Sequence, residues 1–446
     1  MRMIEKPSKL GLMIVGLGGA VATTAVAGIE LLKLGVIGTE GLPMSQVPQD
    51  LTRGLADYES IVFGGWDLSP DDLSQAAATH NVLTLQQFQA AAPVLSQIKP
   101  LPAVGNSKFC ANIACEHRAL AETHREAIEL LRKNMRDFQT ENQTDALVLI
   151  NLASTESFID QSASVFASLK YFEQALDANA PEISPAMIYA YAAIAEGVPY
   201  ANFTPSLAAD VPALVEFARQ MQVPIAGKDG KTGQTMIKTA IAPAFKTRAL
   251  KVEGWYSTNI LGNRDGLALS NPESLKSKVT TKGSVLDEIL GYKVEDHIVD
   301  IRYYRPRGDN KEAWDNIDVV GFLGQQMQIK INFLCRDSIL AAPLVIDIAR
   351  LLDGAKRRGS GGVQEQLSVF FKLPQIGNPA AQPVHALHLQ EQMLLRWLEE
   401  GKSLENNSNE SLPTDRRETL NGHSVTNGNG HAVKVEASAA TENGKR

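Results

Sequence analysis

Four lysines stand beside polar turns in the second half of the chain, where amines could act as bases or as cations. They are Lys278, Lys282, Lys311 in a Gly-Asp-Asn-Lys turn, and Lys372 among apolar neighbours. A single lysine is far more often a solvated surface charge. Clustered lysines lower one another's pKa, and an amine freed in this way can accept a proton near neutral pH. The pattern therefore indicates proton transfer or stabilisation of a developing oxyanion.

A glycine-rich turn near the N-terminus has the composition of a dinucleotide-binding loop. Gly16-Leu17-Gly18-Gly19 separates a short apolar run from a stretch of small residues. Glycines let the chain turn tightly and bring its N–H groups against a pyrophosphate, and the following helix adds positive potential. Asp67, which ends the next apolar run, is the acid expected on the ribose or adenine side. The same pattern is also typical of a plain glycine turn.

A second glycine-rich turn carries threonines and could hold a phosphate. Residues 227–235 read GKDGKTGQT and include the Gly-Lys-Thr of a P-loop. A P-loop also needs a glycine five residues before Gly230, and that position is Ile225, so the P-loop interpretation fails. A turn that opens a helix can still bind phosphate through backbone N–H groups and hydroxyls. The alternative is a lysine-rich surface turn.

The spacing of the cysteines and histidines is poor evidence for a metal site. Cys110, Cys115, His117 and His124 have a spacing that matches no closed structural zinc site, so no metal ion is expected. The three cysteines of the chain are too few for a disulfide framework. Their number is typical of a protein from a reducing compartment.

Apolar runs in the first half of the chain alternate with helical stretches. Strands are expected at 11–15, 60–63, 146–150 and 222–226, and a long helix at 116–138. Such alternation is typical of a parallel sheet with helices on both faces. We therefore expect an α/β fold with a doubly wound, Rossmann-like domain.

The pattern changes after about residue 245. The segments 251–261, 297–305 and 319–333 alternate like strands of an antiparallel sheet with one buried face. The chain is thus predicted to divide into a first domain at 8–240, an inserted sheet-rich α+β domain at 241–337, a return to the first domain at 338–402, and a disordered tail at 403–446 with hardly any apolar residues. Helices are expected at 338–352 and 363–371, and an amphipathic segment at 382–400.

Composition and the N-terminal segment limit the function classes. The chain has 446 residues and a net charge of −7, which argues against nucleic acid as a partner because phosphate-backbone binding needs a cationic surface. Residues 10–32 follow a basic flank and contain Ala-Val-Ala, as a signal peptide does. The rival interpretation divides this segment into a strand and a helix of small residues, since its glycines and threonines make a poor membrane helix. We favour the second and expect a cytoplasmic protein with no membrane partner.

Taken together, these motifs resemble the inositol-3-phosphate synthase (myo-inositol-1-phosphate synthase) family over residues 10–395. Each motif is modest alone, but ten in one order are a strong signal. The resemblance also argues against a signal peptide, because cleavage after Ala27 would destroy the nucleotide loop. The matching segments are GLGGAVATT at 16–24, GGWD at 64–67, ASTE at 153–156, Pro-x-x-x-Phe-x-Pro at 199–205, KTGQT at 231–235, LGNRDG at 261–266, Lys278, Lys282, GDNK at 308–311 and DSILA at 337–341.

The resemblance implies an isomerase that uses NAD to convert D-glucose 6-phosphate to 1D-myo-inositol 3-phosphate. The implied steps are oxidation at C5, enolisation, closure of C6 on C1, and re-reduction. It assigns NAD binding to the Rossmann-like domain, and catalysis and oligomerisation to the inserted domain. A homotetramer is expected, both from the resemblance and because the apolar stretch 319–333 is long enough to need covering.

On the matched positions, the resemblance also implies residue roles. Catalysis would involve Lys278, Lys282, Lys311, Lys372 and Asp229. The substrate phosphate would be held by Thr232, Gly233, Gln234, Thr235 and Lys282. NAD would contact Gly16, Leu17, Gly18, Gly19, Asp67, Ala153, Thr155, Thr232, Asn263, Asp265, Asp309, Asp337 and Ser338.

Several positions depart from the family's usual pattern. Ala20 and Val21 stand where two asparagines are usual, Ser157 replaces an arginine, and Arg264 replaces a second asparagine. These departures suggest a divergent, bacterial-type branch. Two alternatives stay open: a paralogue that cyclises or oxidises another sugar phosphate, and a non-catalytic NAD-binding regulatory protein. Retention of the four lysines argues against the second.

Overall fold

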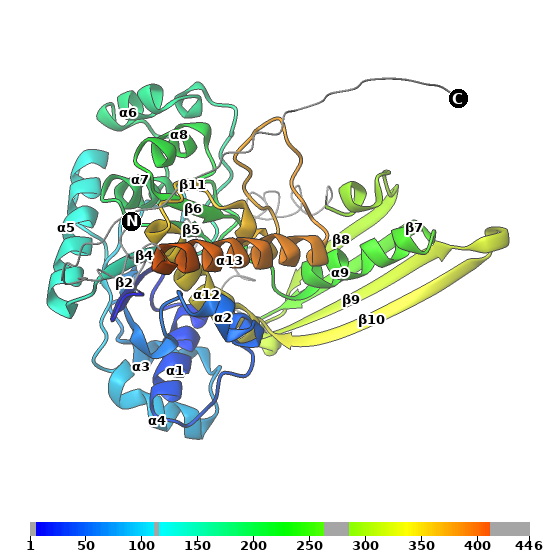
Figure 1. The fold of residues 1–446 in the computed structure, drawn as a ribbon, viewed down its shortest axis with the longest axis horizontal. Coiled ribbons are helices and arrows are strands. Elements are labelled where there is room, and N and C mark those ends of the chain that lie inside the picture. Colours follow the sequence, from blue (N-terminus) through cyan, green and yellow to red (C-terminus); the bar gives the residue numbers. More distant parts are fainter. Residues whose placement is uncertain (1–5, 111–115, 263–284, 411–446) are drawn as a thin grey trace, which may run out of the picture.

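A seven-stranded parallel sheet forms the centre of the larger part of the molecule (Figure 1). The computed structural model describes residues 6–110, 116–262 and 285–410, with side chains described to residue 402. The strand order is β11-β6-β5-β4-β1-β2-β3, and every neighbouring pair is parallel. This is the doubly wound order with one strand added, so the predicted Rossmann-like fold is confirmed. The strands are β1 (Leu10–Val15), β2 (Ile61–Asp67), β3 (Leu101–Pro102), β4 (Ala146–Asn151), β5 (Tyr200–Asn202), β6 (Pro224–Gly227) and β11 (Gly362–Val363).

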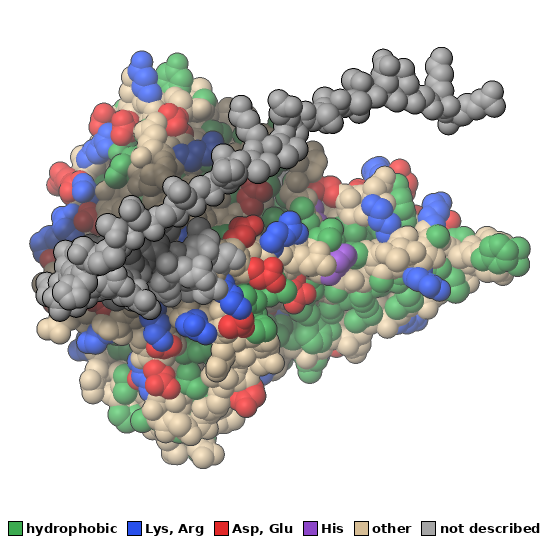
Figure 2. All heavy atoms as spheres, in the orientation of Figure 1, with side chains coloured by type: hydrophobic (Ala, Val, Ile, Leu, Met, Phe, Trp, Pro, Cys, Tyr) green, Lys and Arg blue, Asp and Glu red, His purple; other side chains and the backbone are tan. Residues whose placement is uncertain are grey.

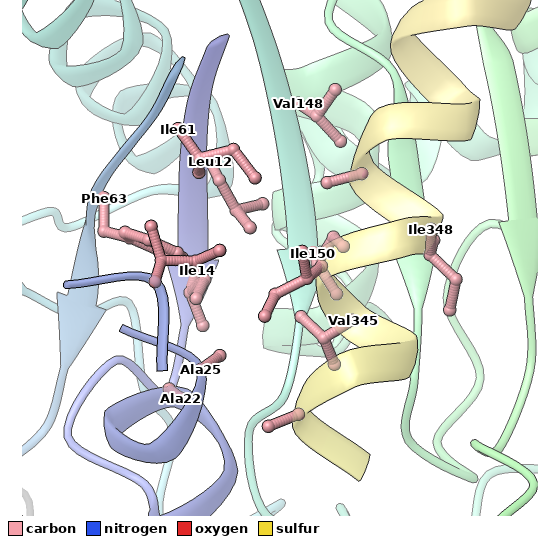
Figure 3. Close-up of a cluster of buried hydrophobic side chains, with 14 of the residues drawn as sticks. Leu12, Ile14, Ala22, Ala25, Ile61, Phe63, Val148, Ile150, Val345 and Ile348 are labelled. Carbon is pink, nitrogen blue, oxygen red and sulfur yellow. The ribbon is translucent and has the colours of Figure 1, made fainter. Parts of the chain in front are cut away.

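Helices cover both faces of this sheet because its strands are apolar on both sides. In β1, Leu12 and Ile14 face α1 (Ala20–Lys33) and α12 (Asp337–Arg357), as Figure 3 shows. Met13 and Val15 face the opposite side and pack into a second core. That core includes α5 (His124–Asn142), α6 (Leu169–Asp177), α7 (Pro185–Ala195) and α8 (Pro212–Gln220). The remaining helices of this part are α2 (Gln49–Thr52), α3 (Leu73–His80), α4 (Leu85–Leu95) and α13 (Leu387–Glu410).

A second sheet of four strands, in the order β10-β9-β7-β8, extends from the first part as a long arm (Figure 1). Its strands are β7 (Lys251–Leu261), β8 (Asp296–Tyr303), β9 (Asn310–Val320) and β10 (Gln326–Arg336). Helix α9 (Gly233–Thr247) and the helical residues 285–290 cover one face through a separate apolar core. The chain then returns to the parallel sheet through α12 and β11.

The predicted antiparallel character of this sheet is only partly right. β9 pairs antiparallel with β7 and β10, but β7 and β8 run parallel. Parallel neighbours need a long crossover, and residues 262–295 provide it. The stretch 319–333, expected as one strand, is a hairpin that turns after Val320, because Gly321 and Gly324 supply the turn.

Two helix predictions were also wrong in part. The helix expected at 116–138 begins at His124, because Thr123 and Glu126 form a capping box that starts it there. Leu120, inside the range predicted to be helical, therefore lies before the helix and is 99% exposed. The helix expected at 363–371 is the end of β11 followed by a 3-10 helix at Glu365–Phe370.

The N-terminal apolar segment divides as predicted into β1 and α1, both with buried faces. Across the ranges that the structure describes, no helix combines the length and hydropathy that a membrane crossing requires. At the other end, α13 continues to Glu410, past residue 403 where the tail was expected to begin. The domain boundaries drawn from the sequence stay predictions.

Candidate functional site

A cavity of about 500 Å³ lies at the carboxyl ends of the parallel strands. It opens beside β1 and β4, where the strand order reverses, which is the usual ligand position in doubly wound sheets. The same cavity reaches the second sheet and the return segment, since Lys311 and Lys372 also line it. One space thus joins the glycine-rich loop to the lysines.

The glycine-rich loop presents the N-terminus of α1 to this cavity. Gly16 has a φ of +86°, a left-handed conformation that favours glycine, and its N–H donates to the carbonyl of Trp66 at 2.8 Å. The N–H of Gly18 donates to Asp67 Oδ2 at 2.8 Å. Gly19 is the N-cap residue and has no side chain to accept from the first turn. The N–H groups that open α1 are therefore available to an anion.

Two ion pairs lie at the other end of the cavity. Lys372 Nζ is 2.7 Å from Asp229 Oδ1, and Lys311 Nζ is 3.5 Å from Asp337 Oδ1. Thr232 Oγ1 also donates to Asp337 Oδ1 at 2.9 Å. We had expected clustered lysines to act on one another, but these two lysines each pair with an aspartate. Both side chains line the cavity.

Most of the described site residues from the sequence line this cavity. They are Gly16, Gly18, Gly19, Asp67, Ala153, Thr155, Asp229, Thr232, Lys311, Asp337, Ser338 and Lys372. Four other expected residues, Asn263, Asp265, Lys278 and Lys282, lie outside the described residues.

Five expected residues do not line the cavity. The side chain of Leu17 is buried in the core and its N–H donates to the Trp66 carbonyl, because the loop turns inward there. Asp309 lies behind Ser338, whose hydroxyl donates to it at 2.6 Å, and burial raises the pKa of Asp309. Gly233, Gln234 and Thr235 are buried in the first turn of α9. The Gln234 amide donates to Asp315 and accepts from Asn259, so its side chain has partners in the second sheet.

Comparisons with known proteins match this arrangement along nearly the whole chain. A family model described as myo-inositol-1-phosphate synthase, of the NAD-binding type, matches residues 10–399. The chain is 43% identical to inositol-3-phosphate synthase 1 of Bacteroides thetaiotaomicron, over 89% of this chain and 97% of that one. It is 30% identical to inositol-3-phosphate synthase of Saccharomyces cerevisiae, over 89% and 85% of the two chains. The chain belongs to the myo-inositol-1-phosphate synthase family.

Solved structures support the same assignment. The crystal structure of inositol-3-phosphate synthase from Caenorhabditis elegans matches with a TM-score of 0.83 at 26% identity, covering 93% of this chain and 91% of that chain. A myo-inositol-1-phosphate synthase-related protein from Thermotoga maritima matches with a TM-score of 0.74. The cofactor of this family is NAD.

The glycine-rich loop fits NAD in three respects. It offers the uncapped N-terminus of α1 for the pyrophosphate, the Asp67 carboxylate at the end of β2 for the ribose, and room for close approach at Gly18. A Cβ added at Gly18 would lie 3.2 Å from Asp67 Oδ2, so a side chain would displace that carboxylate. The residues present therefore suit the cofactor.

We expect Gly18→Ala to weaken NAD binding about tenfold or more, a change of about 1.4 kcal/mol. The added methyl would lie 3.2 Å from Asp67 Oδ2, so the carboxylate expected at the ribose must move away from the position in which it accepts from the Gly18 N–H. Gly28→Ala, in the middle of α1, is the matched control because a Cβ added there meets nothing within 4 Å. Calorimetric titration with NAD should show that the control binds NAD with unchanged affinity. In thermal unfolding, the control should have a higher melting temperature than the wild type, since alanine favours a helix interior. Equal NAD affinity in both variants would contradict this picture of the loop.

Three residues that line the cavity were missed by the sequence analysis. His80 places Nε2 2.8 Å from the Gly18 carbonyl, and Tyr189 accepts from the Val104 N–H at 2.9 Å. Glu156 lines the cavity, is 6% exposed, and accepts from the Ala186 N–H at 2.9 Å through Oε1. Burial raises the pKa of Glu156 to about 7, and its Oε2 has no hydrogen-bond partner among the described residues. Its place after Thr155 in a matched motif was the available signal.

Two further buried lysines lie away from the cavity. Lys231 donates to Gln390 of α13, and burial lowers its pKa to about 7. Lys238 lies on α9 and is buried between this helix and the second sheet. The described histidines of the rejected metal set, His117 and His124, contact backbone carbonyls, and the described part of the chain contains no cluster of three acidic, histidine or cysteine side chains suited to a metal.

Proposed function

We propose that this chain is an inositol-3-phosphate synthase, which isomerises D-glucose 6-phosphate to 1D-myo-inositol 3-phosphate. The observation that carries the proposal is the single cavity shared by the glycine-rich loop and the two lysine–aspartate pairs. An enzyme that oxidises, cyclises and reduces one substrate must hold the nucleotide and the acid–base groups around the same carbon atoms. The family membership makes a sugar phosphate the substrate class.

The residues divide into an anion-binding set and a charge-stabilising set. Thr232, the N-cap residue of α9 that lines the cavity, would hold the dianionic phosphate, and the positive potential at the N-terminus of that helix would support it. The chemistry that NAD supplies when bound is removal of a hydride from C5 and its later return. Lys372 would lie at the reacting carbons, with Asp229 orienting its ammonium group at 2.7 Å. Lys311, held by Asp337, would stabilise the enolate and aldol oxyanions.

The remaining sequence-derived roles complete the proposal. Lys278 and Lys282 would contribute further cations, and Asn263 and Asp265 would contact the nucleotide. The 241–337 segment would serve catalysis and assembly, and the rest would bind NAD. The cytoplasm is the proposed location, in keeping with the low number of cysteines in the chain.

The direct test is to incubate the purified protein with glucose 6-phosphate and NAD and to identify the product by ³¹P and ¹H NMR. The expected product is an inositol phosphate, with no net accumulation of NADH. Accumulation of NADH with an oxidised sugar phosphate would instead identify a dehydrogenase paralogue. No change of the sugar phosphate, with NAD binding retained, would overturn the enzymatic proposal for this substrate.

We further propose that four copies assemble through the second sheet. Its outer face carries Tyr256, Ile298, Trp314 and Leu334, one from each strand, and all four are 45% exposed or more. Figure 2 shows hydrophobic side chains along this arm. Large apolar side chains exposed among polar ones, such as Asp318 and Lys330 on the same face, are typical of an interface between subunits.

The protein should therefore behave as a tetramer in light scattering at micromolar concentration. Trp314→Glu with Leu334→Lys should lower the mass, because two charges would be buried at the interface. Leu85→Lys is the control, since Leu85 is 72% exposed on the distant α4. A wild-type monomer at this concentration would refute the assembly.

A further inference from the structure

A buried polar network joins the first turn of α9 to the second sheet. Gln234 Nε2 donates to Asp315 Oδ2 at 3.0 Å, and Asn259 donates its side-chain amide to Gln234 Oε1. The oxygen and the nitrogen of the Gln234 amide therefore each have a defined partner in the second sheet. All three side chains are 5% exposed or less, so water does not compete for these bonds.

Asp315 is itself held in a fixed orientation. Its Oδ1 accepts from Trp255 Nε1 at 2.6 Å and from Ser257 Oγ at 2.7 Å. Three donors on three different side chains thus surround one buried carboxylate. Hydrogen bonds to a charged acceptor are short and directional, and they are stronger in a dry interior.

A buried lysine on the same face of α9 supplies the opposite charge. Lys238, one turn after Gln234, places Nζ 2.7 Å from His297 Nε2 and 5.4 Å from the centre of the Trp255 ring. Burial lowers the pKa of Lys238 to about 8, while the charge of Asp315 opposes that shift. Further along α9, Ala242 and Phe245 make only apolar contacts with the sheet core. The side-chain hydrogen bonds described from α9 to the strands of the second sheet therefore lie in its first two turns.

We propose that Asp315 is a positioning residue for the phosphate-binding turn at 232–235, acting through the amide of Gln234. The first N–H groups of α9 have no intrahelical acceptor, and Thr232, its N-cap residue, lines the cavity. The position of this turn beside the cavity depends on how α9 packs against the second sheet, which the Asp315–Gln234–Asn259 contacts fix at the first turn. The inference rests on the proposed function for the substrate, but the geometry concerns any phosphate bound at this turn.

Exchanging the hydrogen-bond donor at Gln234 and the acceptor at Asp315 tests whether Asp315 positions this turn. Gln234→Glu places two carboxylates face to face, and Asp315→Asn turns an NH₂ group toward the Gln234 NH₂ group. The double variant, Gln234→Glu with Asp315→Asn, restores one donor facing one acceptor and keeps a single buried carboxylate. Trp255, Ser257 and Asn259 keep their partners in the double variant.

Calorimetric titration with inorganic phosphate and, separately, with NAD gives the readout. Each single variant should weaken phosphate binding about tenfold or more, because a buried polar group loses its partner. NAD affinity should stay within about twofold in both, because α1 and Asp67 are not part of the network. The double variant should recover phosphate affinity to within about threefold of the wild type.

Matched controls separate positioning from general destabilisation. Gln220→Glu and Glu216→Gln change a similar amide–carboxylate pair, 3.1 Å apart, on the exposed side of the distant α8 and should alter neither affinity. If a single variant fails to fold, Ser257→Ala removes only one donor to Asp315 and should still weaken phosphate binding a few-fold. Lack of recovery in the double variant, or an equal loss of NAD affinity, would overturn the inference. A wild type that binds phosphate but leaves glucose 6-phosphate unchanged would overturn the proposed function instead.

Discussion

Replacing Lys372 by methionine should lower the turnover of glucose 6-phosphate at least about a hundredfold. Methionine keeps the aliphatic length but removes the ammonium group that lies 2.7 Å from Asp229 in the cavity. A single acid–base or oxyanion partner contributes about 10²–10⁴ in rate. NAD affinity should change only a few-fold, because the glycine-rich loop lies at the other end of the cavity. Steady-state kinetics with NMR detection and calorimetry with NAD measure the two effects.

Two further variants make this result specific. Lys170→Met changes an exposed lysine on α6 and should leave turnover unchanged. Since Asp229 is 4% exposed, loss of Lys372 could also destabilise the fold. Lys372→Met combined with Asp229→Asn removes both charges and should restore the melting temperature without restoring turnover. Normal turnover in either Lys372 variant would mean that this lysine has no catalytic role.

The stability of the protein should fall between pH 4.5 and about 7 through Glu156. Burial raises the pKa of this carboxyl from 4.5 to about 7 in the folded state. The folded protein therefore holds a proton in this range that the unfolded chain has lost, and the contribution to stability disappears as the pH rises through the folded pKa. The shift corresponds to about 3 kcal/mol of unfolding free energy.

Glu156→Gln isolates this contribution, because an amide keeps the shape of the carboxyl and does not titrate in this range. The difference in unfolding free energy between variant and wild type, from urea denaturation, should move by about 3 kcal/mol in favour of the variant between pH 4.5 and 8. Glu59→Gln, at an exposed position, is the control and should leave the shape of the profile unchanged. A pH-independent difference for Glu156→Gln would show that burial does not raise the pKa of this carboxyl.

The family assignment makes the missing asparagines at Ala20 and Val21 informative about the cofactor site. Both residues line the cavity in the first turn of α1 with side chains that cannot form hydrogen bonds. The anion-binding contribution of this turn is therefore the backbone and the helix dipole. Gly18 and Asp67 consequently carry more of the recognition, which is why the largest cofactor effect is expected at Gly18.

Local patterns in the sequence were sufficient for four of the seven strands of the parallel sheet, whereas β3, β5 and β11 have only two or three residues each and give no apolar run. The strands β1, β2, β4 and β6 all overlap the apolar runs that predicted them. Each run is short, apolar and followed by a turn. A parallel strand that is buried on both faces is recognised in a sequence by this pattern alone. The glycine-rich turn and Asp67 could likewise be placed, since both follow directly from a strand end.

The sequence by itself determined the family, the fold and most of the cavity lining, because contiguous motifs record the backbone that a strand, turn and helix N-terminus require. Only the tertiary structure decided which side chains are partners across long separations, such as Lys372 with Asp229 and Gln234 with Asp315. It also decided that β8 runs parallel to β7 and that Glu156 is buried beside α7. Such contacts depend on the packing of segments that lie far apart in the chain. A local pattern of apolar and polar residues does not determine which polar side chains become buried together, and so it does not determine which of them form ion pairs or hydrogen bonds.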